Sequence, residues 1–229
     1  MRVLALETAT LAGSAALLEG GHVVGQIALN IALTHSERLM AMVDRLLQDC
    51  RWETADLEGL AVSVGPGSFT GLRVGVATAK GLALALGLPV AAVPTLDALA
   101  GNLPFADALV CPVLDARKGE VYLSLYRWAG DGFERQWDYL ALPPRSAAER
   151  LAAAAPVILL GDGVATCLPF LSGLGAELRL APPSHSTPSA ALVGQLGHAM
   201  IKAGQAVAVD ALSPLYLRPS EAELKARRT

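Results

Sequence analysis

The sequence is poor in the residues that build disulfide frameworks, metal centres and base-stacking surfaces. Its three cysteines, Cys50, Cys111 and Cys167, lie far apart and form no CxxC motif, so we expect reduced thiols in a cytoplasmic protein. The four histidines, at positions 22, 35, 185 and 198, have none of the short spacings of a metal site. Aromatic residues make up 5% of the chain, which is too few for a base-stacking platform.

Charge is also scarce and nearly balanced. Charged residues make up 17% of the chain, and the net charge is −3. Autonomous tight binding of nucleic acid needs a clustered positive face. The basic run here is Lys225, Arg227 and Arg228, at the end of the chain. We therefore expect no autonomous tight binding of nucleic acid by this chain.

Long apolar runs of the kind that span membranes are interrupted. The most apolar stretch, roughly residues 74–93, contains Lys80, Gly87 and Pro89, which indicates a buried helix followed by a strand. The N-terminal residues begin directly with a strand-like run, and we expect no signal peptide ahead of it. Both observations favour a cytoplasmic protein with no membrane association.

Apolar residues are abundant, at 53% of 229 residues, and predict one large domain or two compact lobes. The first part of the chain predicts an α/β order: strands 2–7, 13–18 and 22–29, a helix 35–50, a strand 58–64, a glycine-rich loop 65–71, a helix 71–87, a strand 89–93 and a helix 95–101.

The second half repeats this plan in element order. It predicts strands 109–115, 120–128 and 132–140, a helix 146–154, a strand 156–160, a turn 161–163, a short helix and a final helix 188–203. We expect two lobes with mixed sheets, 1–103 and 104–229, divided at Asn102–Pro104, the second being degenerate and ending in the basic tail.

The helix 35–50 carries the clearest local pattern. Thr34 and Glu37 fit a capping box. One apolar stripe follows, formed by Leu39, Val43, Leu46, Leu47 and Cys50. We interpret His35, beside the cap, as a surface or capping residue and not as a catalytic base.

The most informative segment is GPGSFTGLRVG, residues 65–75. Ser68, Thr70 and Arg73 stand at a helix start, where free amides and the helix dipole favour an anion. The segment fits neither the GxGxxG nor the Walker A motif. A tight strand-to-helix turn, with glycines for close packing, is an equally good interpretation.

Two further loops occupy equivalent places in the two halves. Glu7, Thr8 and Thr10 follow the first strand, and Asp115 and Lys118 follow the first strand of the second half. Such loops hold phosphates, or Mg²⁺ through water, in some proteins, and ordinary polar turns are the alternative. Gly161 and Gly163 form a third candidate turn. No nucleophile motif surrounds any serine or cysteine.

The helix 71–87 is apolar on two faces, and therefore needs two partners. Its first face runs through Gly71 and Gly75, with Thr78, Leu82 and Ala85. The second face is formed by Val74, Ala77, Gly81, Leu84 and Leu88.

Several segments resemble one known family. ALETATLAGSAALL, THSERL (34–39), VGPGSFTGLRVGVATAKGLALALGLPV (64–90) and PTLDALA (94–100) are very similar to the TsaB family, also called YeaZ. The resemblance thins to DARKGEVY (115–122), GDG (161–163) and PLYLR (214–218). It implies the actin-like ATPase fold, which is ribonuclease H-like and has two lobes of one plan.

The resemblance also implies a function. TsaB is the non-catalytic partner of the related TsaD in making threonylcarbamoyl-adenosine beside the anticodon of tRNAs that read A-starting codons, and both work with the ATPase TsaE. TsaD-type relatives carry an HxxxH metal motif, which falls here on Thr95 and Leu99. Neither side chain replaces an imidazole. Glu7 stands where the family usually has Asp.

We therefore predict a scaffold with no catalytic residue, no metal and no tightly bound cofactor. Weak binding of ATP or ADP in the complex is compatible with this prediction. We expect a homodimer when the chain is alone. An independent actin-like ATPase or small-molecule kinase is the alternative, and a peptidase would need a zinc site that the sequence lacks.

The predicted partner interface is Leu39, Val43, Gly71, Leu72, Gly75, Thr78, Ala79 and Leu82. The predicted vestigial nucleotide or anion site is Glu7, Thr8, Thr10, Ser68, Thr70, Arg73, Asp115, Lys118, Gly161 and Gly163.

Overall fold

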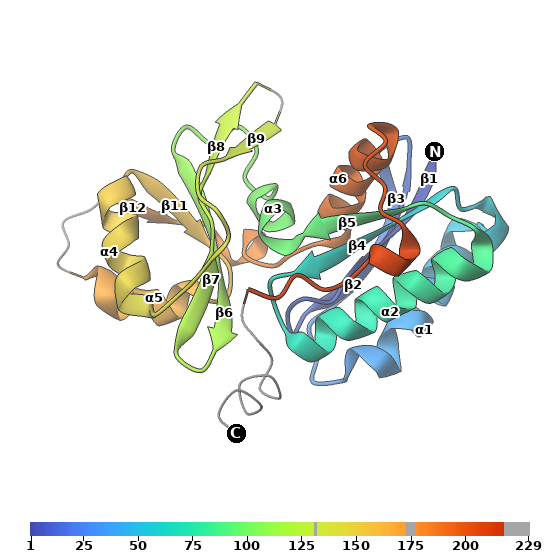
Figure 1. The fold of residues 1–229 in the computed structure, drawn as a ribbon, viewed down its shortest axis with the longest axis horizontal. Helices are drawn as coiled ribbons and strands as arrows, with labels where there is room; N and C mark the ends of the chain where they lie inside the picture. The colour runs from blue at the N-terminus through green and yellow to red at the C-terminus, as the bar shows by residue number, and fades with distance from the viewer. Residues whose placement is uncertain (131, 173–176, 218–229) are drawn as a thin grey trace.

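The computed structural model describes residues 1–130, 132–172 and 177–217. It contains two sheets that lie side by side, each with helices against it (Figure 1). The basic tail at Lys225, Arg227 and Arg228 lies outside the described residues.

The first sheet has the strand order β3-β2-β1-β4-β5. Its strands are β1 (Arg2–Glu7), β2 (Gly13–Glu19), β3 (His22–Leu29), β4 (Gly59–Gly65) and β5 (Val90–Pro94). The first three strands pair antiparallel, and β1, β4 and β5 pair parallel. The helices α1 (His35–Cys50) and α2 (Phe69–Leu86) cover one face, and α6 (Ala190–Lys202) covers the other.

The second sheet repeats this order as β10-β7-β6-β11-β12, with β8 and β9 attached to β6. Its strands are β6 (Leu109–Arg117), β7 (Glu120–Leu123), β8 (Tyr126–Ala129), β9 (Gly132–Arg135), β10 (Leu140–Leu142), β11 (Val157–Leu160) and β12 (Leu178–Leu180). The helices α4 (Pro144–Ala154) and α5 (Val164–Leu171) pack on it. The matching orders and directions confirm the duplication that element order predicted.

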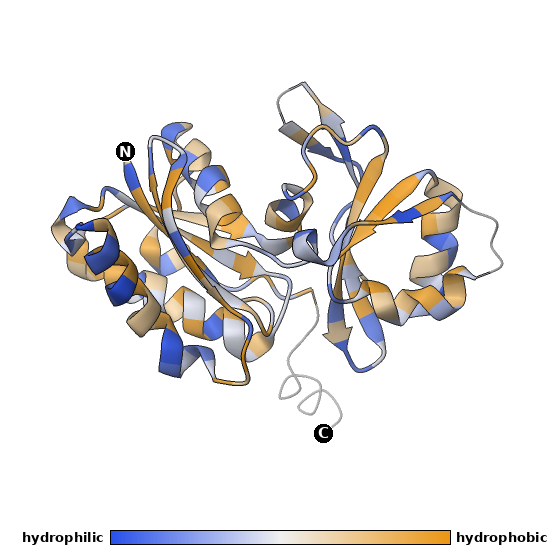
Figure 2. Cartoon of the chain, turned by 180° about the vertical axis from the view of Figure 1, so that it is seen from behind, coloured by the Kyte–Doolittle hydropathy of each residue, from blue (hydrophilic) through white to orange (hydrophobic). Residues whose placement is uncertain are grey.

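Alternation along the strands explains why each lobe closes around its own core. In β1, Leu4 and Leu6 point toward α1 and α2, whereas Val3 and Ala5 point toward α6. Burial of both faces produces the nearly continuous apolar run of residues 2–6. The strands at the centre of each sheet are mostly hydrophobic in Figure 2, whereas hydrophilic residues gather on the helices.

The two long strands expected at 120–128 and 132–140 are each broken in two. Ser124 lies at the break between β7 and β8. Its hydroxyl donates to the Trp137 carbonyl at 2.7 Å. The Leu125 carbonyl then accepts the Gln136 amide at 2.6 Å. This crossing lets β7 pair with β10 while β8 and β9 form a separate hairpin. The strand β12 was not predicted.

The chain returns to the first lobe at its end. The helix α6 contacts β1, β2, β4 and β5, and Gly194 and Gly197 allow it to lie close to Leu18 and Ala61. The prediction that all residues after 104 belong to the second lobe is therefore wrong for α6. Element order could not reveal this, because an apolar helix fits either sheet.

The helix α3 (Thr95–Ala100) lies between the two lobes (Figure 1). Leu96 and Leu99 pack with the second sheet and Ala98 packs with the first. Its residues other than Asp97 are fully buried.

Within the described residues, the helix α2 is long and apolar enough to cross a membrane by length and composition. This is weak evidence for a membrane span, because core helices pass the same test. Here Val76, Ala79 and Ala83 pack into the first core.

Candidate functional site

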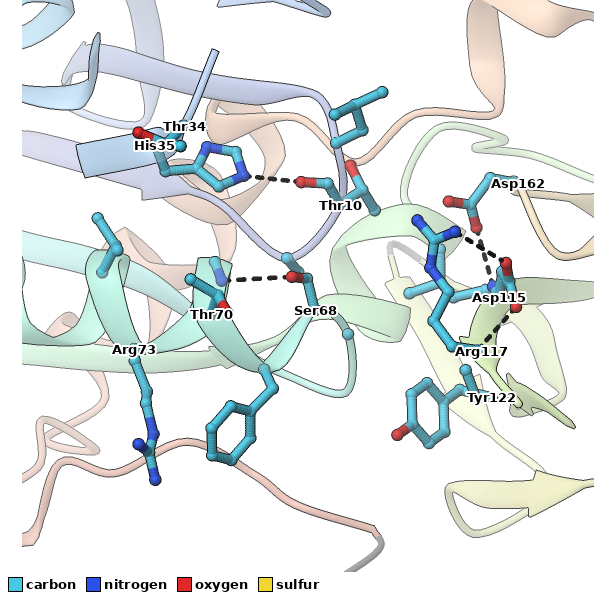
Figure 3. Close-up of a pocket in the computed structure, with 18 of the residues that line it drawn as sticks. Thr10, Thr34, His35, Ser68, Thr70, Arg73, Asp115, Arg117, Tyr122 and Asp162 are labelled. Carbon is cyan, nitrogen blue, oxygen red and sulfur yellow. Dashed lines mark hydrogen bonds and ion pairs between the residues drawn. The ribbon is translucent and has the colours of Figure 1, made fainter. Parts of the chain in front are cut away.

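A cavity of about 920 Å³ lies between the lobes, and both lobes line it. The first lobe contributes the β1–β2 turn, the connection from β3 to α1 and the start of α2. The second contributes the end of β6, Tyr122 and Asp162, and Tyr216 comes from the end of the described chain. Figure 3 shows side chains of the two lobes facing each other across this space. A cavity of this volume accommodates a ligand the size of a nucleotide.

The start of α2 is fixed by its cap and by close packing. The Ser68 hydroxyl accepts the Gly71 amide at 3.3 Å, and the Ser68 amide donates to the Ala9 carbonyl at 2.7 Å. A side chain at Gly67 would collide with that same carbonyl. The glycine-rich loop therefore serves close packing against the β1–β2 turn, and it also places Ser68 and Thr70 on the cavity.

Arg73 lies at the rim of the cavity with partners of its own. Its guanidinium stands 3.9 Å from the centre of the Phe69 ring, and its Nε donates to the Tyr216 hydroxyl at 3.1 Å. Phe69 and Tyr216 stack with 5.1 Å between ring centres. In Figure 3, Arg73 points away from Thr10 and Asp162. Its charge therefore contributes to the field at the mouth of the cavity more than to a contact in its centre.

The wall of the second lobe is a chain of hydrogen bonds. The Asp162 carboxylate accepts the Asp115 amide at 3.0 Å, and the Asp115 carboxylate accepts the Arg117 amide at 2.7 Å. The Arg117 guanidinium pairs with the same carboxylate at 3.7 Å. Burial raises the pKa of Asp162. Arg117, Lys118 and Gly119 all have positive φ, so this turn holds its basic residues in a sparsely populated conformation.

Glu7 and Thr8 lie beneath the cavity and do not line it, contrary to the prediction. Both are fully buried. One Glu7 carboxylate oxygen accepts the Ala9 amide at 2.5 Å, and the other has no partner in the described part of the chain. Burial raises the pKa of Glu7 to about 7. The carboxyl of Glu7 is therefore separated from the cavity by the residues that line it, among them Ala9.

Gly161 and Gly163 are also absent from the lining. A Cβ atom at either position would collide with the backbone of β6, at Val113 or Leu114. Their smallness is needed for packing. Of the ten predicted site residues, the structure brings together Thr10, Ser68, Thr70, Arg73, Asp115 and Lys118.

Sequence reasoning missed other lining residues, including His35, Arg117, Tyr122, Asp162 and Tyr216. His35 is neither on the open surface nor part of the cap, because its ring is half-buried and its Nε2 lies 2.8 Å from the Thr10 carbonyl. All five stand in segments that resemble the family, so the motifs indicated the right regions but not the direction of each side chain.

In residues 1–130, 132–172 and 177–217, no group of three His, Cys, Asp or Glu side chains is placed to hold a metal ion. Thr95 and Leu99 are both fully buried in α3.

The predicted partner interface needs correction. Leu39, Val43 and Ala79 belong to the first hydrophobic core, and Leu72 is 1% exposed. Gly71 and Gly75 are buried as well, and a Cβ atom at either would collide with Thr8. These six residues are buried in the single chain and leave little surface for a partner. Thr78 and Leu82 are half-buried.

The exposed part of α2 combines three residues of the predicted second face with Ala85 of the first, whereas Val74 and Leu88 of the second face are half-buried against the core. Ala77, Gly81, Leu84 and Ala85 are exposed, and Leu84 keeps 69% of its surface accessible. A Cβ atom at Gly81 would meet no atom within 4 Å. Met40 is exposed on the neighbouring α1. We call Met40, Ala77, Gly81, Leu84 and Ala85 the outer helix face.

Comparisons with known proteins agree with one another. The sequence model of the TsaD family, described as tRNA N6-adenosine threonylcarbamoyltransferase, matches residues 22–158. The tRNA threonylcarbamoyladenosine biosynthesis protein TsaB of Bacillus subtilis is 34% identical over 227 residues, which cover 98% of this chain and 97% of that protein. The protein of the same name from Escherichia coli is 34% identical over 230 residues and 95% of each chain.

The fold is also similar to that of a solved structure. YeaZ from Pseudomonas aeruginosa superposes with a TM-score of 0.81 at 29% identity, over 94% of this chain and 99% of that one. Together with the two matching strand orders, this likeness confirms the expected two-lobed actin-like fold.

Proposed function

Because the chain belongs to the TsaB family and takes part in tRNA threonylcarbamoyladenosine biosynthesis, we propose that it is a non-catalytic partner of a TsaD homologue, which performs the transfer. The observation that carries this proposal is the outer helix face. Ala77, Gly81, Leu84 and Ala85 are exposed on α2, whose opposite face is packed into the core, and Met40 is exposed on the neighbouring α1.

An exposed apolar helix face of this kind favours association with another helix. Small residues at Ala77 and Gly81 let a second backbone come close, and Leu84 offers an apolar anchor. The same face would serve a homodimer when the chain is alone, so homodimer and heterodimer would compete. We further propose a cytoplasmic location, contact with a TsaE homologue at a surface that the sequence does not identify, and tRNA binding through the complex.

Two features support a non-catalytic role. The metal-binding histidines of TsaD-type relatives correspond to Thr95 and Leu99, which are buried and offer no imidazole. Glu7, the acidic residue at the end of β1, is fully buried and does not line the cavity.

The cavity fits a nucleotide only in part. Its size suffices, and Arg73, Arg117 and Lys118 supply positive charge at its lining. However, Asp115 and Asp162 already accept hydrogen bonds from the backbone, and no carboxylate from β1 reaches it. We therefore propose weak ATP or ADP binding at most, without turnover. An independent ATPase is the second candidate, favoured by the volume of the cavity.

The test is a pull-down with the TsaD homologue of the same cell. We expect wild-type chain to retain the homologue and Leu84→Arg to lose it, because a buried unpaired guanidinium costs several kcal/mol. Leu180→Arg is the matched control, since Leu180 is 55% exposed in the second lobe. Equal retention by all three proteins would show that the interface lies elsewhere. Failure of wild-type chain to bind would contradict the proposed function.

A further inference from the structure

The motif THSERL has a structural consequence that a capping box does not explain. Arg38 is 5% exposed. Its Nη1 donates to the carbonyls of Leu29 and Ile31 at 3.2 and 3.3 Å, and its Nη2 donates to the Leu11 carbonyl at 2.6 Å. One buried side chain on α1 therefore ties the β1–β2 turn to the end of β3.

His35 completes the arrangement. Its Nε2 lies 2.8 Å from the Thr10 carbonyl and its Nδ1 lies 3.2 Å from Nη2 of Arg38. A carbonyl only accepts and a guanidinium only donates. The ring must therefore be neutral, with its proton on Nε2 and a lone pair on Nδ1. If Nδ1 also carried a proton, two hydrogen-bond donors, Nδ1 of His35 and Nη2 of Arg38, would face each other.

Two glycines leave the space that these side chains fill. A Cβ atom at Gly13 would stand 2.8 Å from Nδ1 of His35 and 3.2 Å from Nη2 of Arg38. A Cβ atom at Gly71 would stand 3.1 Å from the His35 ring. The three segments that carry most of the family resemblance therefore meet around one histidine and one arginine.

The consequence reaches the cavity. Thr10 and Leu11 line it, as do residues 32–36 on the other side of the arrangement. In a planar trans peptide, the N–H points opposite to the carbonyl. Because the carbonyls of Thr10 and Leu11 turn toward His35 and Arg38, the amides of Leu11 and Ala12 turn away from them. The orientation of the Leu11 and Ala12 amides is therefore fixed before a ligand or partner segment binds in the cavity.

We propose that His35 and Arg38 are positioning residues that clamp the first-lobe wall of the interlobe cavity, and that the clamp holds only while the His35 ring is neutral. The burial of the ring and the neighbouring Arg38 both lower the pKa of His35. Acidification should therefore release the Thr10–Ala12 turn without unfolding the lobe.

The charged groups around His35 determine whether protonation of its ring is favoured or opposed. On its own helix it faces Arg38, and the β1–β2 turn and α2 present a carbonyl and a glycine to it. The remaining charges lie along the same cavity. They are Arg73, Asp115, Arg117, Lys118 and Asp162. The cation in direct contact is Arg38, so protonation of His35 is opposed and not compensated.

A pH titration of the full chain by NMR tests the proposal. We expect the amide signals of Leu11 and Ala12 to shift with the same midpoint as the His35 ring, below the value of about 6.5 for a free histidine. His35→Gln keeps a donor for the Thr10 carbonyl but cannot gain a proton, so its Leu11 and Ala12 signals should not move over this range.

Arg38→Lys tests the other half, because an ammonium group cannot bridge three carbonyls with the geometry of a guanidinium. We expect loss or broadening of the Leu11 and Ile31 amide signals at pH 7, while those of β4 stay unchanged. Arg45→Lys, on the exposed side of α1, is the control. Unmoved Leu11 and Ala12 signals in wild-type chain, or a titration that persists in His35→Gln, would overturn the proposal. So would uniform changes across the lobe in Arg38→Lys.

Discussion

Gly75 of α2 lies directly against Thr8 at the end of β1, so closely that a Cβ atom at position 75 would collide with the Thr8 hydroxyl. Thr8 is fully buried and its hydroxyl has no hydrogen-bond partner in the described part of the chain. The GxxxG pair of this helix therefore holds α2 against its own sheet. The association proposed above would use the opposite face.

This contact gives a matched pair of glycine substitutions. Gly75→Ala should destabilise the protein by about 1–3 kcal/mol, because the added methyl group overpacks a buried site. Gly81→Ala adds the same methyl to an open, exposed position of the same helix and should stabilise it by about 0.5–1 kcal/mol through helix propensity. Urea unfolding measures both. Equal effects of the two substitutions would place Gly75 on an open surface and contradict the packing described above.

Glu7 predicts an unusual dependence of stability on pH. Its pKa of about 7 in the folded chain lies above the ordinary 4.5 because of burial. The folded state then holds a proton that the unfolded state releases, so stability falls as pH rises from about 4.5 to 7. Across that range the loss is roughly 3 kcal/mol, at about 1.4 kcal/mol per pH unit.

Glu7→Gln removes this dependence, because an amide mimics the protonated carboxyl. The variant should match wild type at pH 4.5 and exceed its stability at pH 8, as measured by urea unfolding at each pH. Glu37→Gln provides a contrast of opposite sign. Hydrogen bonds from Thr34 lower the pKa of exposed Glu37, so its removal should reduce stability at neutral pH. Parallel profiles for wild type and Glu7→Gln would contradict the prediction.

Asp97 predicts a stability effect at the junction of the lobes. Its carboxylate accepts the hydroxyls of Tyr126 and Tyr139 at 2.6 and 2.8 Å. Asp97→Ala would leave the buried Tyr126 hydroxyl without this acceptor and should cost about 3 kcal/mol, whereas Asp97→Asn keeps an oxygen and should cost about 1 kcal/mol. Asp49→Ala, which breaks an exposed pair with Arg45, should cost less than about 0.5 kcal/mol. Similar losses for Asp97→Ala and Asp49→Ala would show that the tyrosine contacts contribute little.

The elements of the first lobe could be predicted because local patterns and tertiary packing agree there. The predicted strands 2–7, 13–18 and 22–29 and the helix 35–50 agree within one residue with β1, β2, β3 and α1. The capping box of Thr34 and Glu37 is present, and its stripe from Leu39 to Leu47 lies in the core.

The errors come from contacts between distant segments. Both faces of α2 are apolar, and the close approach of Gly75 to Thr8, 67 positions earlier, decides which one is buried. Similarly, the break at Ser124 depends on Trp137, and α6 could pack on either sheet. Glu7 stands at the end of the first strand, as expected. Its burial results from tertiary packing, which the sequence pattern does not reveal.

The purified chain should not turn over ATP above background. The cavity offers no carboxylate from β1, and the carboxylates of Asp115 and Asp162 accept backbone hydrogen bonds. A phosphate-release assay with Asp162→Asn as the comparison measures this. Turnover that Asp162→Asn abolishes would support the independent ATPase.

Reconstitution of threonylcarbamoyl transfer to tRNA tests the central claim most directly. The TsaD homologue of the same cell is assayed with its other components, with and without this chain, and the modified adenosine is quantified. We expect product when both proteins are present, none from this chain without the TsaD homologue, and little with Leu84→Arg in place of wild type. Product formed by this chain without the TsaD homologue, or equally fast formation by the homologue without this chain, would contradict the account.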